Sequence, residues 1–253
     1  MTVTFLGTGT SGGVPMIACN CEVCQSPDSK DKRLRTSILI QTEIANIAID
    51  AGPDFRQQML QTGIKKLDAI IFTHAHKDHT GGLDDVRAFN HHMQQPMQIF
   101  ADARTLGILK MQYDYAFHEN PYPGAPKLAV HEISNEPFEV AGLKFQPIEV
   151  MHKDLPVLGF RFNNFTYITD ANFIADCEKE KILGTEILVL NALRRDKHYS
   201  HFSLDEAVEL SMEFKARQTY FTHISHQLGK HKVVAEELPE TVGLAFDGLQ
   251  LKI

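Results

Sequence analysis

Tryptophan is absent from this 253-residue sequence, and cysteine is scarce, with four residues. Four cysteines are too few for a disulfide scaffold in a chain of this length. No stretch approaches the 18 apolar residues that a membrane helix needs. The first 21 residues carry no charge, but Thr, Gly and Ser interrupt their apolar runs and no Lys or Arg precedes them, which does not fit a targeting segment. We therefore expect a cytoplasmic protein without a membrane partner.

Long clusters of basic residues are also missing. The formal net charge is -7, and the densest basic stretch, Lys30–Arg35, is interrupted by Asp31. Tight binding to nucleic acid depends on clustered Lys and Arg, because the affinity comes largely from counterion release. The sequence therefore argues against a long nucleic acid partner. A small anion bound at a metal remains compatible with it, since bound cations dominate the local field of a site.

The composition otherwise matches an ordinary globular protein, with 43% hydrophobic and 23% charged residues. At roughly 150 residues per domain, this length fits one large α/β domain or two small ones. We found no linker, repeat or low-complexity segment, and the Pro-rich stretch 120–126 is interpreted as a rigid surface loop. The sequence therefore predicts a single domain over residues 1–253.

Two kinds of segment alternate along the chain. Short β-branched and aromatic runs predict strands at 3–6, 36–41, 45–49, 69–73, 97–101, 143–150, 159–162, 165–169, 187–190, 219–222 and 249–253. Helical spacing of apolar residues predicts helices at 54–61, 83–92, 103–117, 174–181, 203–215 and 231–238. Ser203 and Glu206 form a capping-box pattern at the start of one of these helices. The alternation predicts an α/β fold with sheets covered by helices.

Histidine is abundant, with 13 residues, and its densest cluster follows the strand predicted at 69–73. His74, His76, Asp78 and His79 lie within six residues, where a strand end holds the backbone and leaves the site open. His74 and His76 point the same way if the chain stays extended, while Asp78 and His79 turn toward a second ion. Mixed nitrogen and carboxylate ligands suit Zn²⁺, Mn²⁺ or Fe, and this spacing permits a two-metal site.

This H-x-H-x-D-H segment resembles the metallo-β-lactamase superfamily, and the resemblance extends over nearly the whole chain. It implies a four-layer αββα sandwich in which two mixed sheets are flanked by helices. The family's remaining functional positions correspond, in chain order and each after a strand-like run, to Asp50, His152, Asp170 and His223. The resemblance implies that one metal is held by His74, His76 and His152, and the other by Asp78, His79 and His223. Asp170 would bridge the two metals, and Asp50 would orient a ligand histidine by a hydrogen bond.

A second cluster contains three of the cysteines, Cys19, Cys21 and Cys24. Three thiolates need a fourth ligand to close a tetrahedral zinc site, and Cys177, His226 and His231 are the candidates. With His226, three residues after His223, a structural zinc would tie the N-terminal loop to the strand end that carries the catalytic site. Cys177 is interpreted as an ordinary buried thiol.

The Gly-rich segment 7–15, the cysteine triad, His226 and the segment 246–248 together resemble the cyclic phosphodiesterase branch, which includes phosphoribosyl 1,2-cyclic phosphate phosphodiesterase. This implies hydrolysis of small cyclic or nucleotide-like phosphodiesters by two divalent metals, Mn²⁺ or Zn²⁺. Three alternatives stay open: a ribonuclease Z-like nuclease, an accessory protein similar to pyrroloquinoline-quinone biosynthesis protein B, and a lactone or thioester hydrolase. Only 17 residues separate His152 from Asp170, which leaves no room for the RNA-gripping arm of ribonuclease Z.

The leaving oxygen of a phosphodiester needs a proton, which an imidazole can supply near neutral pH. His201 is the candidate donor and His198 a weaker one; Asp78 is also expected to act in catalysis. Arg194 and Arg195 could steady a phosphate, although surface charge explains them equally well. We expect structural or solvated roles for His91 and His92 on a helix and for His118 and His131 in loops. The family resemblance also implies a homodimer.

Overall fold

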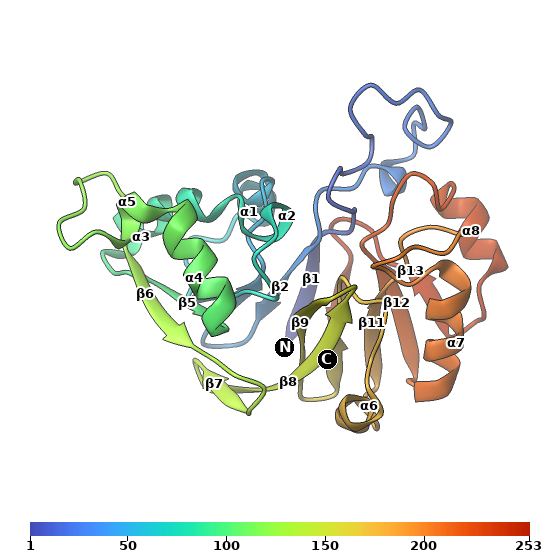
Figure 1. Cartoon of the computed structure of the whole chain (residues 1–253). Coiled ribbons are helices and arrows are strands. Elements are labelled where there is room, and N and C mark those ends of the chain that lie inside the picture. The colour runs from blue at the N-terminus through green and yellow to red at the C-terminus, as the bar shows by residue number, and fades with distance from the viewer.

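Two seven-stranded mixed sheets form the centre of the protein, as the computed structural model of residues 1–253 shows (Figure 1). The first sheet has the order β14-β1-β2-β3-β4-β5-β6, antiparallel from β14 to β3 and parallel from β3 to β6. Its strands are β1 (Thr2–Gly7), β2 (Ser37–Gln41), β3 (Asn46–Ile49), β4 (Ala69–Ile71), β5 (Met97–Ala101), β6 (Leu128–Glu132) and β14 (Gln250–Lys252).

The second sheet repeats this plan with the order β13-β12-β11-β10-β9-β8-β7, antiparallel from β7 to β10 and parallel from β10 to β13. Its strands are β7 (Phe138–Val140), β8 (Leu143–His152), β9 (Leu155–Phe162), β10 (Phe165–Tyr167), β11 (Ile187–Asn191), β12 (Gln218–Thr222) and β13 (Val242–Leu244).

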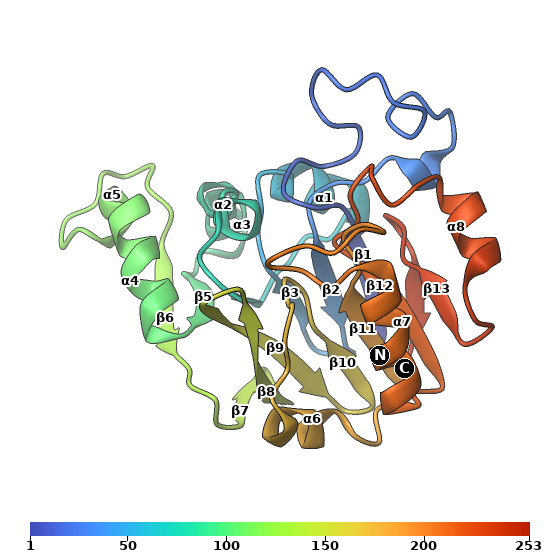
Figure 2. The ribbon, with the colours of Figure 1, turned by 45° about the vertical axis from the view of Figure 1, so that its right-hand side comes forward.

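Helices cover the outer face of each sheet (Figures 1 and 2). On the first sheet these are α1 (Phe55–Thr62), α2 (Lys77–Thr80), η2 (Leu83–Val86), α3 (Arg87–Met93), α4 (Ala103–Gln112) and α5 (Asp114–Phe117). On the second they are α6 (Asp176–Ile182), α7 (Leu204–Phe214) and α8 (His231–Glu237), while the short η1 (Ser29–Asp31) lies in the loop between β1 and β2. The capping box of Ser203 and Glu206 is present at α7. The predicted four-layer αββα architecture is confirmed.

Alternating burial along the strands creates three apolar layers. In β2, Ile38 and Ile40 face the core between the sheets, whereas Leu39 faces the helices. In β11, Val189 faces inward and Leu188 packs under the outer helices. Strands buried on both faces read as continuous apolar runs, which is why they could be found in the sequence. None of the helices has the length and apolar character that a membrane crossing requires.

Some predicted elements differ from the structure. Strands β6, β7 and β13 were not predicted, and His131, expected in a loop, lies in the edge strand β6, where its ring stacks on Phe100 at 4.4 Å. The helix predicted over 103–117 is divided into α4 and α5 at Tyr113. Tyr113 is buried, and its hydroxyl donates to the backbone oxygen of Thr80, so a tertiary contact determines the break.

Candidate metal centre

Sharp turns at strand ends position three of the predicted site residues. Asp50 follows β3, Asp170 comes shortly after β10 and His223 follows β12, and all three have positive φ angles of 67°, 55° and 56°. Asp, Asn and His adopt this left-handed conformation more readily than most side chains. Since the carboxyl ends of parallel strands meet at one edge of a sheet, these turns bring distant segments together.

The segment after β4 lies against the turn that carries Asp50. Here the chain passes His74 and His76 and enters α2 with Asp78 and His79. Gly52 makes the close approach possible, because a Cβ atom there would overlap the backbone oxygen of Asp78. The two loops therefore form one rigid wall of the site.

The predicted histidine ligands lie side by side. Ring centroids are 4.5 Å apart for His74 and His76, 5.1 Å for His76 and His152, and 4.3 Å for His74 and His79. His223 stacks on His79 at 5.8 Å. Segments that are far apart in the chain thus converge at one centre, as the sequence predicts.

Hydrogen bonds leave the Nε2 atom free in three of these rings. Nδ1 of His79 lies 2.7 Å from Oδ2 of Asp50, Nδ1 of His152 lies 2.8 Å from the backbone oxygen of Ser200, and Nδ1 of His74 lies 3.0 Å from Oγ1 of Thr73. In each ring, a proton on Nδ1 leaves the lone pair on Nε2.

The Nε2 atom of His74 is buried and has no hydrogen-bond partner, while Nε2 of His79 is buried beside the carboxylates of Asp78 and Asp170. Buried polar atoms are rarely left unsatisfied without a reason. A bound metal ion would satisfy the His74 atom, and a ring held through its other nitrogen is the usual arrangement of a metal-binding histidine.

The charge distribution also favours a cation. Burial alone would lower the pKa of His79, but the negative charges of Asp170, Asp78 and Asp50 outweigh it and raise the pKa well above its usual value. Burial would raise the pKa of Asp170, but attraction to His223 and His79 lowers it well below the usual range. The Asp170 carboxylate is therefore ionised at neutral pH, and a metal ion bound at Nε2 of His79 would replace the second proton that this field retains on the ring.

Asp170 connects both halves of the cluster. Its Oδ2 lies 3.1 Å from Nε2 of His79 and 3.1 Å from Nδ1 of His223, and its Oδ1 lies 3.0 Å from Nε2 of His201. The potential ligand atoms of Asp78, His79, Asp170 and His223 all lie within 4.8 Å of one another. The same is true of a second group, formed by His152, Asp170 and His201. The donor set fits a two-metal centre with a shared carboxylate.

The cysteine cluster forms a second candidate site, in the loop that rises above the body beside α8 (Figures 1 and 2). Nδ1 of His226 lies 3.3 Å from Sγ of Cys19 and 3.3 Å from Sγ of Cys21. With Cys24, these residues place three sulfurs and one nitrogen within 4.8 Å of one another. A Cys₃His set of this kind fits a closed tetrahedral zinc site.

The thiols of this cluster are not equivalent. A hydrogen bond from the backbone of Cys24 lowers the pKa of Cys21 to about 6, whereas burial raises the pKa of Cys24 to about 11. The cluster thus already contains one thiol that ionises readily, and a thiolate is the form that binds metal.

The other candidates for the fourth zinc ligand lie elsewhere. Cys177 was expected to be buried, but it is exposed, because α6 turns Glu178 inward instead. The Glu178 carboxylate accepts hydrogen bonds from Asn135, Lys181 and the backbone of Glu149. His231 lies 3.1 Å from the buried guanidinium of Arg33, which also donates to Thr8.

Among the remaining predicted residues, His198 contacts a residue of the centre. Its Nδ1 atom lies 3.2 Å from Nδ1 of His201. Arg194 donates to the backbone of Asp196 and Lys197, and Arg195 pairs with Glu237, so both arginines are held by their own surroundings. His91 and His92 lie on α3 and His118 follows α5, all three exposed.

Three residues that orient the histidines were not identified from the sequence. The hydroxyl of Thr73 bridges Asp50 and His74, Ser200 holds His152 through its backbone oxygen, and Oγ1 of Thr10 lies 3.2 Å from Nε2 of His223. Thr73 and Ser200 are direct neighbours of the predicted site residues His74 and His201, and this adjacency was the only sign in the sequence that they belong to the site. Thr10 is 213 residues from its partner His223, so nothing in the sequence pointed to it.

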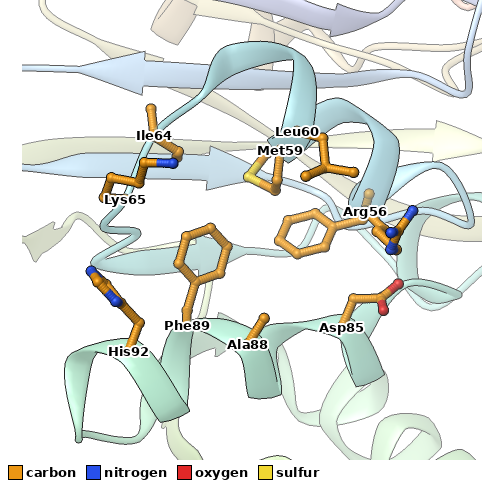
Figure 3. A pocket seen from close by; sticks show the side chains of 10 residues that line it. Arg56, Met59, Leu60, Ile64, Lys65, Asp85, Ala88, Phe89 and His92 are labelled. Atoms are coloured by element: carbon orange, nitrogen blue, oxygen red, sulfur yellow. The ribbon is translucent and has the colours of Figure 1, made fainter.

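Two pockets differ in their relation to the centre. An apolar pocket of about 390 Å³ lies between α1 and α3, where Met59 and Phe89 face each other, and its walls contain none of the predicted ligands (Figure 3). A second pocket, of about 300 Å³, has His74 and His76 in its wall and therefore opens directly beside the centre.

Comparison with known proteins identifies a matching family and solved structures of the same fold. Residues 45–224 match the sequence model of the Beta-lactamase superfamily domain. A solved structure of a new diphosphatase from the PhnP family is 41% identical, with a TM-score of 0.93, and the match covers 100% of this chain and 97% of that one. PqqB from Methylobacterium extorquens, solved with bound Zn²⁺, has a TM-score of 0.79 at 21% identity over 100% of both chains, which establishes similarity of fold alone.

Two curated relatives are longer than this chain. Octanoyltransferase from Porphyromonas gingivalis is 40% identical over 253 residues, covering 99% of this chain and 51% of the relative. Coenzyme PQQ synthesis protein B from Xanthomonas oryzae pv. oryzae is 27% identical over 167 residues, covering 60% of this chain and 53% of the relative. The chain thus spans about half the length of the curated relatives it matches.

Proposed function

The chain belongs to the metallo-β-lactamase superfamily of metal-dependent hydrolases, and within it we propose a phosphodiesterase that hydrolyses small cyclic or nucleotide-like phosphodiesters. The single observation that carries this proposal is the position of His201. Its Nε2 atom lies 3.0 Å from Asp170, and its ring lies beside His152 at 4.6 Å and His223 at 4.8 Å. An imidazole at the edge of the metal cluster is suited to protonate a leaving alkoxide.

We assign the ligands as the sequence predicts. One divalent ion would be held by His74, His76 and His152 and the other by Asp78, His79 and His223, with Asp170 shared. Divalent ions at such a centre, Mn²⁺ or Zn²⁺, lower the pKa of a coordinated water and neutralise the charge on phosphoryl oxygens. Other residues of this chain orient the ligand rings. The Nδ1 atoms of His79, His74 and His152 are held by Asp50, Thr73 and Ser200, respectively.

His201 delivers the proton. Its Nδ1 atom lies 3.0 Å from Oγ of Ser200 and 3.2 Å from Nδ1 of His198, so it has partners that can replace a proton after transfer. We assign Asp78 to catalysis as well as to metal binding, because its ionised carboxylate lies 3.2 Å from Nε2 of His79. The zinc bound by Cys19, Cys21, Cys24 and His226 would be structural, since its four ligands leave no open position.

A diphosphate is the second candidate substrate class. It is supported by the 41% identity to a structure named as a diphosphatase. The inner phosphorus of an organic diphosphate has two bridging oxygens, as the phosphorus of a phosphodiester does. After attack at that atom, the proton from His201 would go to an oxygen of the leaving phosphate instead of an alkoxide.

The names of the curated relatives suggest other activities. We infer that the octanoyl transfer named for the Porphyromonas gingivalis protein belongs to the half of that protein which this chain does not match. The role of an accessory protein, suggested by the match to Coenzyme PQQ synthesis protein B, does not explain the His201 contacts. The homodimer and the cytoplasmic location stay predictions.

Hydrolysis of bis-(p-nitrophenyl) phosphate with added Mn²⁺ tests the proposal. We expect turnover that His76→Ala abolishes and His201→Ala strongly reduces, with full activity in His118→Ala, which removes an exposed histidine outside the centre. Parallel release of phosphate from diphosphate substrates separates the two substrate classes. A protein with a full metal complement that cleaves neither class would contradict the proposal and favour an accessory role.

A further inference from the structure

Two segments lead from the metal centre to the surface on the side of His201. In the loop after β11, Tyr199 comes two residues before His201, and in the turn after β8, Lys153 directly follows His152. Exposure rises along both segments, because His201 is buried and His152 half-buried, whereas Tyr199 and Lys153 are exposed. The two exposed side chains meet, with Nζ of Lys153 5.8 Å from the ring centroid of Tyr199. Tyr199 and Lys153 thus form one rim of the centre.

The ring of Tyr199 is held at this rim with most of its surface uncovered. It packs on the ring of His198, with the centroids 4.3 Å apart and the planes tilted by 33°. The ring of His198 in turn lies 5.2 Å from that of His201. Tyr199 is nevertheless 71% exposed. An aromatic ring that a neighbour already holds, and that is open to solvent, can stack on a second planar ring at a small cost in conformational entropy.

The turn that carries Lys153 also indicates a role for its side chain. Lys153 and Asp154 form a two-residue hairpin loop, since His152 pairs with Leu155. Lys153 has a φ angle of 57°, which glycine or asparagine adopts more readily in such a turn. Its backbone NH donates to Oδ1 of Asn172 at 2.7 Å, and its one ion pair is with the adjacent Asp154, at 3.7 Å. The backbone of the turn is therefore fixed, while the ammonium group stays available beside the aromatic ring.

The position of His201 determines which part of a substrate reaches the rim. His201 is the proposed proton donor to the leaving oxygen, so the leaving group lies on its side of the metals. Two successive ring contacts, through His198, connect His201 with Tyr199. A nucleoside can span this distance, because one sugar separates its phosphorylated oxygen from its base.

We propose that Tyr199 is a stacking platform for a planar heterocycle of the substrate, and that Lys153 closes over the stacked ring by a cation–π contact. The inference rests on the phosphodiesterase function proposed above and narrows its substrates to phosphodiesters of nucleosides, as opposed to sugar phosphates without a base. Every base presents a π face, so the platform selects for the presence of a base and not for its identity.

The first test compares two substrates with the same cyclic phosphate. Adenosine 2′,3′-cyclic phosphate and methyl β-ribofuranoside 2,3-cyclic phosphate differ only in the heterocycle, which a methoxy group replaces in the second. We expect the metal-loaded protein to prefer the nucleotide by roughly 5- to 150-fold in kcat/KM, mainly through KM, since this is the range of base–aromatic stacking.

Variants assign this preference to the rim. Tyr199→Leu should bring the ratio close to unity, Tyr199→Phe should keep it, and Lys153→Met should lower it by about 2- to 5-fold. Tyr122→Leu is the matched control, because it removes another exposed tyrosine, in the loop between α5 and β6, and should keep the ratio. A ratio near one in the unmodified protein, or a preference that persists in Tyr199→Leu, would overturn the platform.

A binding measurement separates failure of this inference from failure of the proposed function. The chain contains no tryptophan, so Tyr199→Trp introduces a single indole at the platform. We expect adenosine 3′-phosphate to quench its fluorescence saturably, methyl β-ribofuranoside 3-phosphate to leave it unchanged, and Tyr122→Trp to respond to neither. Absence of quenching, whether or not calorimetry shows the nucleotide bound, would overturn the platform even if phosphodiesters are cleaved. Quenching without hydrolysis of either cyclic substrate would support the platform and reject the phosphodiesterase.

Discussion

Replacing Asp50 by Asn tests how the second metal is held. Asp50 is completely buried, and its Oδ1 accepts from the backbone NH of Thr73 while Oδ2 lies 2.7 Å from Nδ1 of His79. Asn keeps one oxygen for Thr73 and suits the positive φ of this position, so the fold should persist. Its NH₂ group, however, is a donor that faces the Nδ1 proton of His79.

The expected result is a change of tautomer. His79 must present its lone pair at Nδ1, which moves the proton to Nε2, the atom that lies 3.2 Å from Asp78 and 3.1 Å from Asp170. That atom is then unable to bind a metal without losing its proton. Loss of such an orienting partner typically costs 10- to 100-fold in metal affinity, or about 1.4–2.8 kcal/mol.

Metal content at buffered free zinc concentrations, measured by mass spectrometry, gives the affinity of each ion. We expect one of the two ions of the centre to bind more weakly in Asp50→Asn, while the ion of His74, His76 and His152 is retained. The control is Asp68→Asn, which alters a carboxylate paired with Lys66 outside the centre. If a folded Asp50→Asn protein binds both ions as tightly as the unmodified protein, the orienting role of Asp50 is refuted.

Four further outcomes are expected. Cys21→Ser should lower the zinc content by one ion and the Tm by several degrees, at roughly 2–4 °C per kcal/mol, while the two-metal centre stays loaded; unchanged total zinc would contradict a structural site. Asp170→Asn should weaken both ions of the centre together, and loss of only one would argue against a shared ligand. His201→Ala should reduce kcat by 10²- to 10⁴-fold with normal metal content. Burial and the neighbouring Arg33 lower the pKa of His231 from 6.5 to about 4, so its contribution to stability is present above pH 6.5 and lost as the pH falls toward 4. In denaturant unfolding, the unmodified protein should therefore lose on the order of 2 kcal/mol of unfolding free energy as the pH falls from 6.5 to 4, and His231→Asn should not show this loss. Identical pH profiles for the two proteins would contradict the lowered pKa of His231.

The sequence was most informative where burial and chemistry coincide. Strands such as β4, buried on both faces, stand out as apolar runs, and the candidate ligands of the His74–His79 segment follow this strand directly in the next turn. The His74–His79 segment was identifiable because all its donors are close together in the chain. His152 and His223, by contrast, were identified through their order along the chain and the family resemblance, since a single histidine after a strand has no distinctive pattern.

Edge strands and long-range contacts could not be predicted in the same way. Strand β6 is mostly exposed and β7 has three residues, so neither has a strong alternating pattern. The exposure of Cys177 depends on partners of Glu178 that come from β8 and from Asn135. The contact of Thr10 with His223 exists only because the two sheets bring the ends of the chain together.

That contact has a consequence for dissecting the protein. A fragment consisting of residues 45–224, the part that matches the family model, would contain every predicted ligand of the two-metal centre. It would nevertheless lack β1, β2 and β14, which leaves β3 as an unprotected sheet edge, and it would lack Thr10 and the whole cysteine loop. The minimal catalytic unit is therefore larger than the stretch of chain that carries the motif. Excising the motif would yield an aggregation-prone piece in which His223 has lost its contact with Thr10.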